Sequence, residues 1–198
     1  MLHAALAVVL AVFAGAVAQP LTDQTSTIVD PVGDALYHAP AFQDFVFGQM
    51  TKTAEGDFEL LMELASPVPA SPDLPPHGQT AIWWLWGFDL DPTAFPRGYP
   101  SAPHAAAAPE FFVLVSWDGE EFAGIAIDRR PLLTGGEAIV TTVPFSIDGT
   151  IVEAFLPADL TDGFPASFSW RLRTIDYSGP VGSAGWRPVD LAETVFNP

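Results

Sequence analysis

The sequence predicts an all-β protein: a sandwich of two antiparallel sheets, similar to a jelly roll. Three observations support this fold class. First, 20 prolines and 16 glycines divide the 198-residue chain into short segments rich in Val, Ile, Phe and Trp. Second, several segments alternate apolar and polar residues with the period of two that is typical of half-buried strands. Third, no segment has the spacing of a long amphipathic helix, so two packed sheets are the simplest way to bury the apolar faces.

The first 18 residues are expected to be a signal peptide. This segment is almost wholly apolar or small and ends in Ala-Val-Ala, which matches the pattern that signal peptidase recognises, so cleavage before Gln19 is expected. The segment has no Lys or Arg, which leaves an uncleaved anchor as the alternative. Its apolar stretch is, however, shorter than the roughly 20 residues of a membrane span. We therefore expect a secreted protein with a single domain over residues 19–198.

The charge of the chain limits its partners. All 24 acidic and 7 basic residues lie outside the leader and give a formal charge of −17. Nucleic acid is a poor partner, because affinity for phosphate depends on Lys and Arg, and an anionic membrane surface is disfavoured for the same reason. The chain has no Cys, which excludes disulfides and a lipid-bearing cysteine. No later apolar stretch reaches membrane length, so no membrane insertion is expected after cleavage.

The first half of the domain contains three predicted strands. Residues 42–47 are the first candidate. Residues 58–65 alternate four large apolar side chains with a second set that includes Glu59 and Glu63, which predicts a half-buried strand. After a Pro-rich loop over 67–78, residues 80–89 are apolar on both faces and predict a central strand covered on both sides. A Pro- and Ala-rich loop over 92–109 follows, which we expect to be disordered or lid-like.

The second half is expected to hold two hairpins, one helical turn and a closing strand. Each predicted hairpin contains an Asp-Gly pair, and Asp148-Gly149 is the signature of a two-residue type I′ turn. In chain order, the expected elements are strands over 110–117, 122–128, 140–147 and 150–156, a helical turn over 157–162 and a strand over 167–176. The domain would then have roughly eight strands, with no internal repeat.

An acidic cluster near the start of the domain indicates a calcium site. Asp30 and Asp34 are held close together by an intervening Pro and Gly, and Asp44 follows soon after. Carboxylates this close repel one another unless a cation lies between them, and Ca²⁺ takes six to eight oxygen ligands from flexible loops. We predict that Asp190 completes this site and that the ion thereby joins the two ends of the domain. The alternative is that Asp30 and Asp34 only cap turns by hydrogen bonds to the backbone.

A second acidic cluster follows the most aromatic predicted strand. Asp89 and Asp91 end that strand, and Glu110 stands beyond the loop over 92–109. These three carboxylates predict a second, looser calcium site that bridges the Pro-rich loop.

Aromatic side chains provide candidate contacts for a sugar ring. Trp84 and Trp86 share one face of the strand over 80–89, whereas Trp83 points to the other face. Exposed Trp and Tyr suit stacking on a pyranose ring, because they combine an apolar body with a polar tip. The alternative is that the Trp residues of this central strand belong to the core. The candidate ligand-binding residues are Trp84, Trp86, Tyr99, Trp117 and Trp186.

Several short motifs resemble a known family. The opening Asp-Pro-x-Gly-Asp from Asp30, followed by Gln43-Asp44-Phe45, resembles the secreted carbohydrate-binding-module-9-like and DOMON-like β-sandwiches. The long aromatic strand ending in Asp-Leu-Asp, and the closing Phe-x-Trp strand followed by residues 189–192, are similar too. The resemblance covers most of residues 30–193. It implies a jelly-roll-like fold with bound calcium and, in many relatives, sugar binding or a role as an accessory module.

These observations predict a secreted, non-catalytic, calcium-stabilised binding module with a polysaccharide or glycan as its ligand. The first alternative is a structural or adhesive cell-surface protein without a small-molecule ligand. A remoter one is a haem-binding electron-transfer domain, since some DOMON-like domains hold haem, but Met62 alternates with core residues and is expected to fill the core. Paired carboxylates with a clear signal, a nucleophile elbow and zinc-like His spacing are all missing from the sequence, so we expect no catalytic residues.

Overall fold

The computed structural model describes residues 22–74, 78–94, 109–178 and 186–197. In these ranges the chain forms strands and four short 3-10 helices, without an α-helix. The strands are β1 (Gln24–Val29), β2 (Phe45–Lys52), β3 (Phe58–Leu64), β4 (Ala81–Asp89), β5 (Phe111–Trp117), β6 (Phe122–Asp128), β7 (Ile139–Thr142), β8 (Phe145–Asp148), β9 (Ile151–Leu156), β10 (Phe168–Tyr177) and β11 (Trp186–Phe196). The 3-10 helices are η1 (Leu36–His38), η2 (Ala41–Gln43), η3 (Arg130–Thr134) and η4 (Ala158–Thr161).

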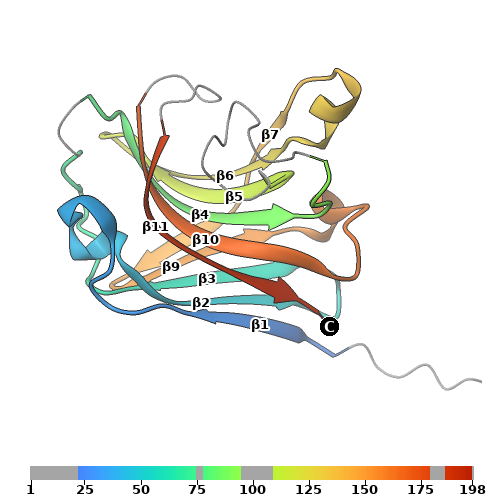
Figure 1. Ribbon diagram of the computed structural model, residues 1–198, viewed down its shortest axis with the longest axis horizontal. Coiled ribbons are helices and arrows are strands. Elements are labelled where there is room, and N and C mark those ends of the chain that lie inside the picture. Colours follow the sequence, from blue (N-terminus) through green and yellow to red (C-terminus); the bar gives the residue numbers. More distant parts are fainter. Residues whose placement is uncertain (1–21, 75–77, 95–108, 179–185, 198) are drawn as a thin grey trace, which may run out of the picture.

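The strands form two antiparallel sheets that lie face to face (Figure 1). One sheet has five strands in the order β1-β2-β3-β9-β8, and the other has six in the order β11-β10-β4-β5-β6-β7. Each neighbouring pair is antiparallel. The predicted all-β class and the two-sheet sandwich are therefore confirmed.

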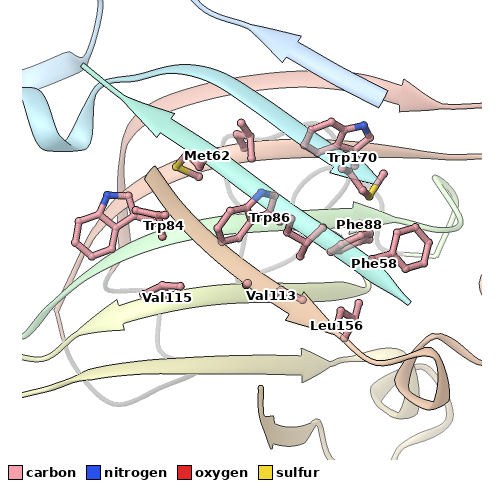
Figure 2. Close-up of a cluster of buried hydrophobic side chains, with 14 of the residues drawn as sticks. Phe58, Met62, Trp84, Trp86, Phe88, Val113, Val115, Leu156 and Trp170 are labelled. Carbon is pink, nitrogen blue, oxygen red and sulfur yellow. The ribbon is translucent and has the colours of Figure 1, made fainter. Parts of the chain in front are cut away.

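One large hydrophobic cluster fills the space between the sheets. The inward side chains of β4, which include Trp84, Trp86 and Phe88, meet Phe58 of β3 and Trp170 of β10 (Figure 2). These five side chains are at most 1% exposed. Successive side chains of a strand point to opposite faces, so every second side chain enters the layer between the sheets. The apolar residues that recur with a period of two therefore form the core.

A glycine sets how closely the two sheets approach at one point. Gly48 of β2 lies directly against the side chain of Leu172 on β10. A Cβ atom added at Gly48 would lie 2.1 Å from Cδ1 of Leu172, well inside van der Waals contact. The sequence therefore needs a residue without a side chain here, because any larger one would push the sheets apart.

Most of the predicted elements match observed ones to within one residue at each end. They are β3, β4, β5, β6, β9 and β10, together with the helical turn, which corresponds to η4. The prediction that β4 is a central strand covered on both faces is also confirmed, since eight of its nine residues are buried.

Two predicted strands differ from the structure. The strand expected over 42–47 begins only at Phe45, because Ala41–Gln43 forms η2. The single strand expected over 140–147 is two strands, β7 and β8, which belong to different sheets. Pro144 lies between them, and since proline has no N–H to donate to a ladder, the chain crosses from one sheet to the other there.

The turn between β8 and β9 also differs from the prediction. Asp148 pairs with Ile151, so the two central residues of the turn are Gly149 and Thr150. Gly149 has φ +60°, and among the described non-glycine residues only Tyr37 and His38 have positive φ. A positive φ at the first central residue alone is the pattern of a type II′ turn, so the hairpin is confirmed and the type I′ geometry is wrong.

The edge strands β1 and β11 were not predicted. They lie at corresponding edges of the two sheets (Figure 1). Ser26 of β1 donates a hydrogen bond to the carbonyl of Val195 on β11 over 3.3 Å. The first and last described strands therefore lie side by side, which brings distant parts of the sequence to one rim of the sandwich. In the described parts of the chain, no helix has the length and apolar character needed to cross a membrane.

Candidate metal centre

Three carboxylates meet between the end of β1 and the interior of β11. Asp30 directly follows β1, Asp34 lies in the next turn and Asp190 belongs to β11. One carboxylate oxygen from each residue lies within 4.8 Å of the other two. Of the described residues, this is the one group of three or more acidic or histidine side chains close enough to hold a metal ion. The structure thus brings together three of the four residues predicted for the first calcium site.

The turn after β1 is shaped by the proline and glycine of the motif. The backbone N–H of Asp30 donates to the carbonyl of Val46 over 3.1 Å, which extends the pairing of β1 with β2 by one residue. Gly33 then adopts φ +88°, a conformation that L side chains rarely adopt. Its N–H donates to Oδ2 of Asp44 over 2.7 Å. Asp44 therefore fixes the turn that presents Asp30 and Asp34.

A β-bulge places Asp190. Thr174 pairs with Asp190 and Ile175 pairs with Pro188, so Val189 is an extra residue in β11. A bulge bends the strand and redirects the side chain that follows. The carboxylate of Asp190 accepts hydrogen bonds from the backbone N–H of Phe45 over 3.0 Å and from that of Leu191 over 2.8 Å. These bonds hold Asp190 against the start of β2, facing Asp30.

The carboxyl groups resist ionisation when no cation is present. Burial raises the pKa of Asp190 to about 7, and the negative charge of Asp30 adds to this rise. The pKa of Asp30 is raised to about 6, mainly by burial and further by the negative charges of Asp34 and Asp44. At neutral pH the ionised cluster is therefore costly unless a positive charge compensates it.

Asp44 is the fourth predicted ligand, and it lies beside the group of three. Asp44 is 4% exposed, and its Oδ1 is buried without a hydrogen-bond partner in the described part of the chain. Oδ2 of Asp30 is buried and unpartnered in the same way. Buried carboxylate oxygens almost always have a partner, so these two atoms favour a bound cation. Asp44 does cap the turn through its Oδ2, but the turn-capping alternative concerns Asp30 and Asp34, and it does not account for the unpartnered Oδ2 of Asp30.

The donor set fits calcium. All the available ligand atoms are carboxylate oxygens, which suit Ca²⁺ and Mg²⁺ better than the softer transition metals. Asp34 is exposed, so water could supply further ligands on that side. Ligands that come from a turn and a bulged strand form an irregular arrangement, which favours Ca²⁺ over Mg²⁺ because Mg²⁺ demands a nearly ideal octahedron.

A buried polar network behind this centre was not predicted. Nε2 of Gln43 donates to Asp176 over 2.8 Å, and the hydroxyl of Thr174 donates to the carbonyl of Gln43 over 2.5 Å. Asp176 also forms a salt bridge with Arg187, whose guanidinium stacks 4.5 Å from the ring centre of Tyr37. The network fastens the segment before β2 to β10 and β11. The Gln-Asp-Phe motif was a signal for Gln43, but nothing in the sequence pairs it with Asp176.

The second acidic cluster is not a metal site in the structure, so that prediction is wrong. Asp89 forms a buried salt bridge with Arg171 over 3.1 Å. Glu110 is 1% exposed, and its Oε2 accepts hydrogen bonds from the N–H groups of Leu90 and Asp91 over 2.6 and 3.3 Å. The side chain of Asp91 instead bonds the following turn. Arg171 and backbone N–H groups bind one oxygen of Asp89 and one of Glu110, whereas Oδ1 of Asp89 and Oε1 of Glu110 are buried without a hydrogen-bond partner in the described part of the chain. Among the described residues, these three carboxylates do not form a group close enough together to hold one metal ion.

The predicted aromatic platform is largely wrong. Trp84 and Trp86 are 0% exposed and Trp117 is 4% exposed, so none of them can stack on a ligand at the surface. The indole N–H of Trp84 donates to the carbonyl of Phe42 in η2 over 3.0 Å, and that of Trp117 donates to the carbonyl of Pro72 over 2.8 Å, so both residues anchor neighbouring segments. The alternative that the Trp residues of the central strand belong to the core is correct for Trp84 and Trp86, and Trp117 is buried as well. Tyr99 and the side chain of Trp186 lie outside the described residues. Met62 is buried in the core as expected.

A groove opens on the outer face of the five-stranded sheet, away from the core. Its volume is 410 Å³, and strands β2, β3, β8 and β9 line it. Its lining combines the carboxylates of Glu59 and Glu153 with apolar side chains that include Leu61 and Phe155. The sequence did not predict this groove, because it depends on which strands are neighbours.

Comparison with protein-family models, with curated proteins and with solved structures finds no match to this chain. The likeness to carbohydrate-binding-module-9-like and DOMON-like domains therefore stays a prediction from short motifs.

Proposed function

We propose that this protein is a secreted, non-catalytic binding module whose sandwich is stabilised by calcium. The observation that supports this most is the convergence of Asp30, Asp34 and Asp190 from the two ends of the domain, with ligand oxygens within 4.8 Å. Two of these carboxyl groups have raised pKa values, which is the expected behaviour of a metal centre in the absence of its ion. The ion would hold the turn after β1 against β11 and so close one rim of the sandwich.

The ligand class that we propose is carbohydrate. The open groove over β3 and β9 supports this, because it combines hydrogen-bond acceptors with an apolar floor, which are the two features that a sugar ring needs. Because Trp84, Trp86 and Trp117 are buried, the groove is the proposed sugar-binding surface instead of an aromatic platform. Carbohydrate binding also agrees with the family resemblance of the sequence motifs.

Thermal unfolding of the mature protein tests the calcium proposal. At a calcium concentration 100 times Kd, selective binding to the native state adds about 2.7 kcal/mol. For a domain of this size, that corresponds to a rise in Tm of roughly 5–10 °C over the value in excess chelator. Asp34→Asn should remove most of this rise, whereas Asp73→Asn, an exposed carboxylate outside the cluster, should keep it. Identical melting curves in calcium and in chelator would refute the proposal.

Binding to insoluble and soluble polysaccharides tests the ligand class. Retention by at least one polysaccharide, with release by its soluble oligosaccharide, is the expected result. A protein that is fully folded in calcium and that no polysaccharide retains would instead favour the structural or adhesive alternative.

A further inference from the structure

We propose that the groove on the outer face of the five-stranded sheet binds an amino sugar, with its protonated amine held between Glu59 and Glu153. This inference rests on the proposed function, which it deepens by naming the site and the class of sugar. The strand register, the charge of the groove and the composition of its floor each support it.

The register places acidic and apolar side chains in a two-by-two pattern. Glu59 pairs across the strands with Phe155, and Leu61 pairs with Glu153. The two carboxylates therefore lie on one diagonal of the pattern and the two apolar side chains on the other. Diagonal neighbours on one face are about 7–8 Å apart, a spacing that lets two carboxylates contact one ligand from opposite sides.

Polar groups continue this pattern at both sides of the groove. Gln49 of β2 pairs with Leu61, and Ser146 of β8 pairs with Glu153. The hydroxyl of Ser146 donates to Oε2 of Glu153 over 2.7 Å, which fixes the direction of that carboxylate. The carboxylate of Glu59 forms no hydrogen bond or ion pair with any residue that the structure describes, so it is available to a ligand.

The charge of the groove selects a cation. Its lining contains two carboxylates and no Lys or Arg. Glu63, two residues beyond Leu61 on the same face of β3, adds a third negative charge. In a protein with a formal charge of −17, this local excess attracts a positively charged ligand and repels an anionic one such as a uronic acid.

The floor of the groove selects a ring with an apolar face. Leu61 and Phe155 are only half-buried, so their upper surfaces are open to a ligand. The volume of 410 Å³ lies within the range of about 300–1,000 Å³ typical of small-molecule sites. A pyranose has an apolar C–H face and a ring of hydroxyl groups, and an amino sugar adds the ammonium group that matches the carboxylates. A lysine side chain offers the charge without this face.

Calorimetric titration of the calcium-loaded protein with four oligomers of equal length tests the inference. The oligomers are glucosamine, N-acetylglucosamine, glucose and lysine. We expect the glucosamine oligomer to bind at least tenfold more tightly than the other three, with an affinity that falls as salt is added. Glu59→Gln and Glu153→Gln should each weaken its binding about threefold, and the double variant about tenfold. Glu63→Gln removes the same charge from the same face outside the groove and should change the affinity less than twofold.

The possible outcomes separate this inference from the function on which it rests. Equal binding of lysine and glucosamine oligomers would overturn the inference, because charge alone would then account for the affinity. Binding of a neutral glycan that the double variant leaves unchanged would overturn it too, while carbohydrate binding itself would survive. If none of the three sugar oligomers binds, the inference fails, and the polysaccharide retention assay then decides the proposed function.

Discussion

Asp30→Asn should reverse its effect on stability when calcium is added. In chelator at pH 8, the wild-type protein carries the cost of an ionised Asp30 beside Asp34 and Asp190. The pKa of Asp30 is raised from 3.8 to about 6, which at roughly 1.4 kcal/mol per pKa unit sets an upper limit of about 3 kcal/mol on that cost. Because Asp30 is only partly buried and Asp34 is exposed, solvent screening reduces the expected gain of the variant to about 1 kcal/mol.

In calcium, the same substitution removes a charged ligand from the ion. The variant should therefore melt roughly 2–4 °C above the wild type in chelator and below it in saturating calcium. The assay is thermal unfolding followed by tryptophan fluorescence, which the buried Trp84, Trp86 and Trp170 make sensitive to the loss of the core. Asp73→Asn is the control for net charge. Destabilisation of Asp30→Asn by the same amount in both conditions would show that Asp30 has a structural role alone, and the metal argument would be refuted.

Three further predictions follow from burial and packing. In chelator, the raised pKa values of Asp30 (about 6) and Asp190 (about 7) mean that the folded state binds more protons than the unfolded state between pH 4 and 7. These two groups should therefore make the chelated protein more stable as the pH falls from 8 to 5. The stabilisation by calcium should disappear over the same interval, because protons compete with the ion for the carboxylates. Thermal melts with calcium and with chelator at several pH values across this range measure both effects. Gly48→Ala should destabilise the protein by about 1–3 kcal/mol in urea unfolding, and Leu172→Ala should partly rescue it by making room for the new methyl group. Asp89→Ala should cost about 3–5 kcal/mol in the same assay, because its buried arginine partner would lose its closest carboxylate, and a cost below 1 kcal/mol would contradict the assignment of a buried ion pair.

The central strands could be predicted from the sequence, and the edge strands could not. β3 and β4 bury every second residue or nearly every residue, so hydrophobic alternation marks them clearly. The sequence of β1 is mostly polar, and only Ile28 is fully buried in it. β11 contains Pro188 and several charged residues. Such strands are held largely by backbone hydrogen bonds to a neighbour, which leave little trace in side-chain hydrophobicity.

The closeness of Asp30 and Asp34 could be predicted because they are near neighbours in the sequence, and the second acidic cluster shows where this reasoning ends. Asp30 and Asp34 are close in the sequence, so their repulsion is visible without a structure. The ion pair of Asp89 depends on Arg171, which lies opposite Gly87 in the neighbouring strand. Gly87 has no side chain, and the stem of Arg171 passes over it. Only the register of β4 with β10 reveals this partner, and a short sequence motif contains no register.

The position of Asp190 near the end of the domain has a consequence for the order in which the protein folds. Asp190 belongs to the last described strand, whereas Asp30 and Asp34 follow the first, so the proposed ion site needs both ends of the domain at once. A nascent chain cannot complete it until β11 has left the ribosome, and contacts this distant in sequence form late. Calcium should then bind only after the two sheets have assembled. It would therefore slow unfolding of the native protein far more than it accelerates folding.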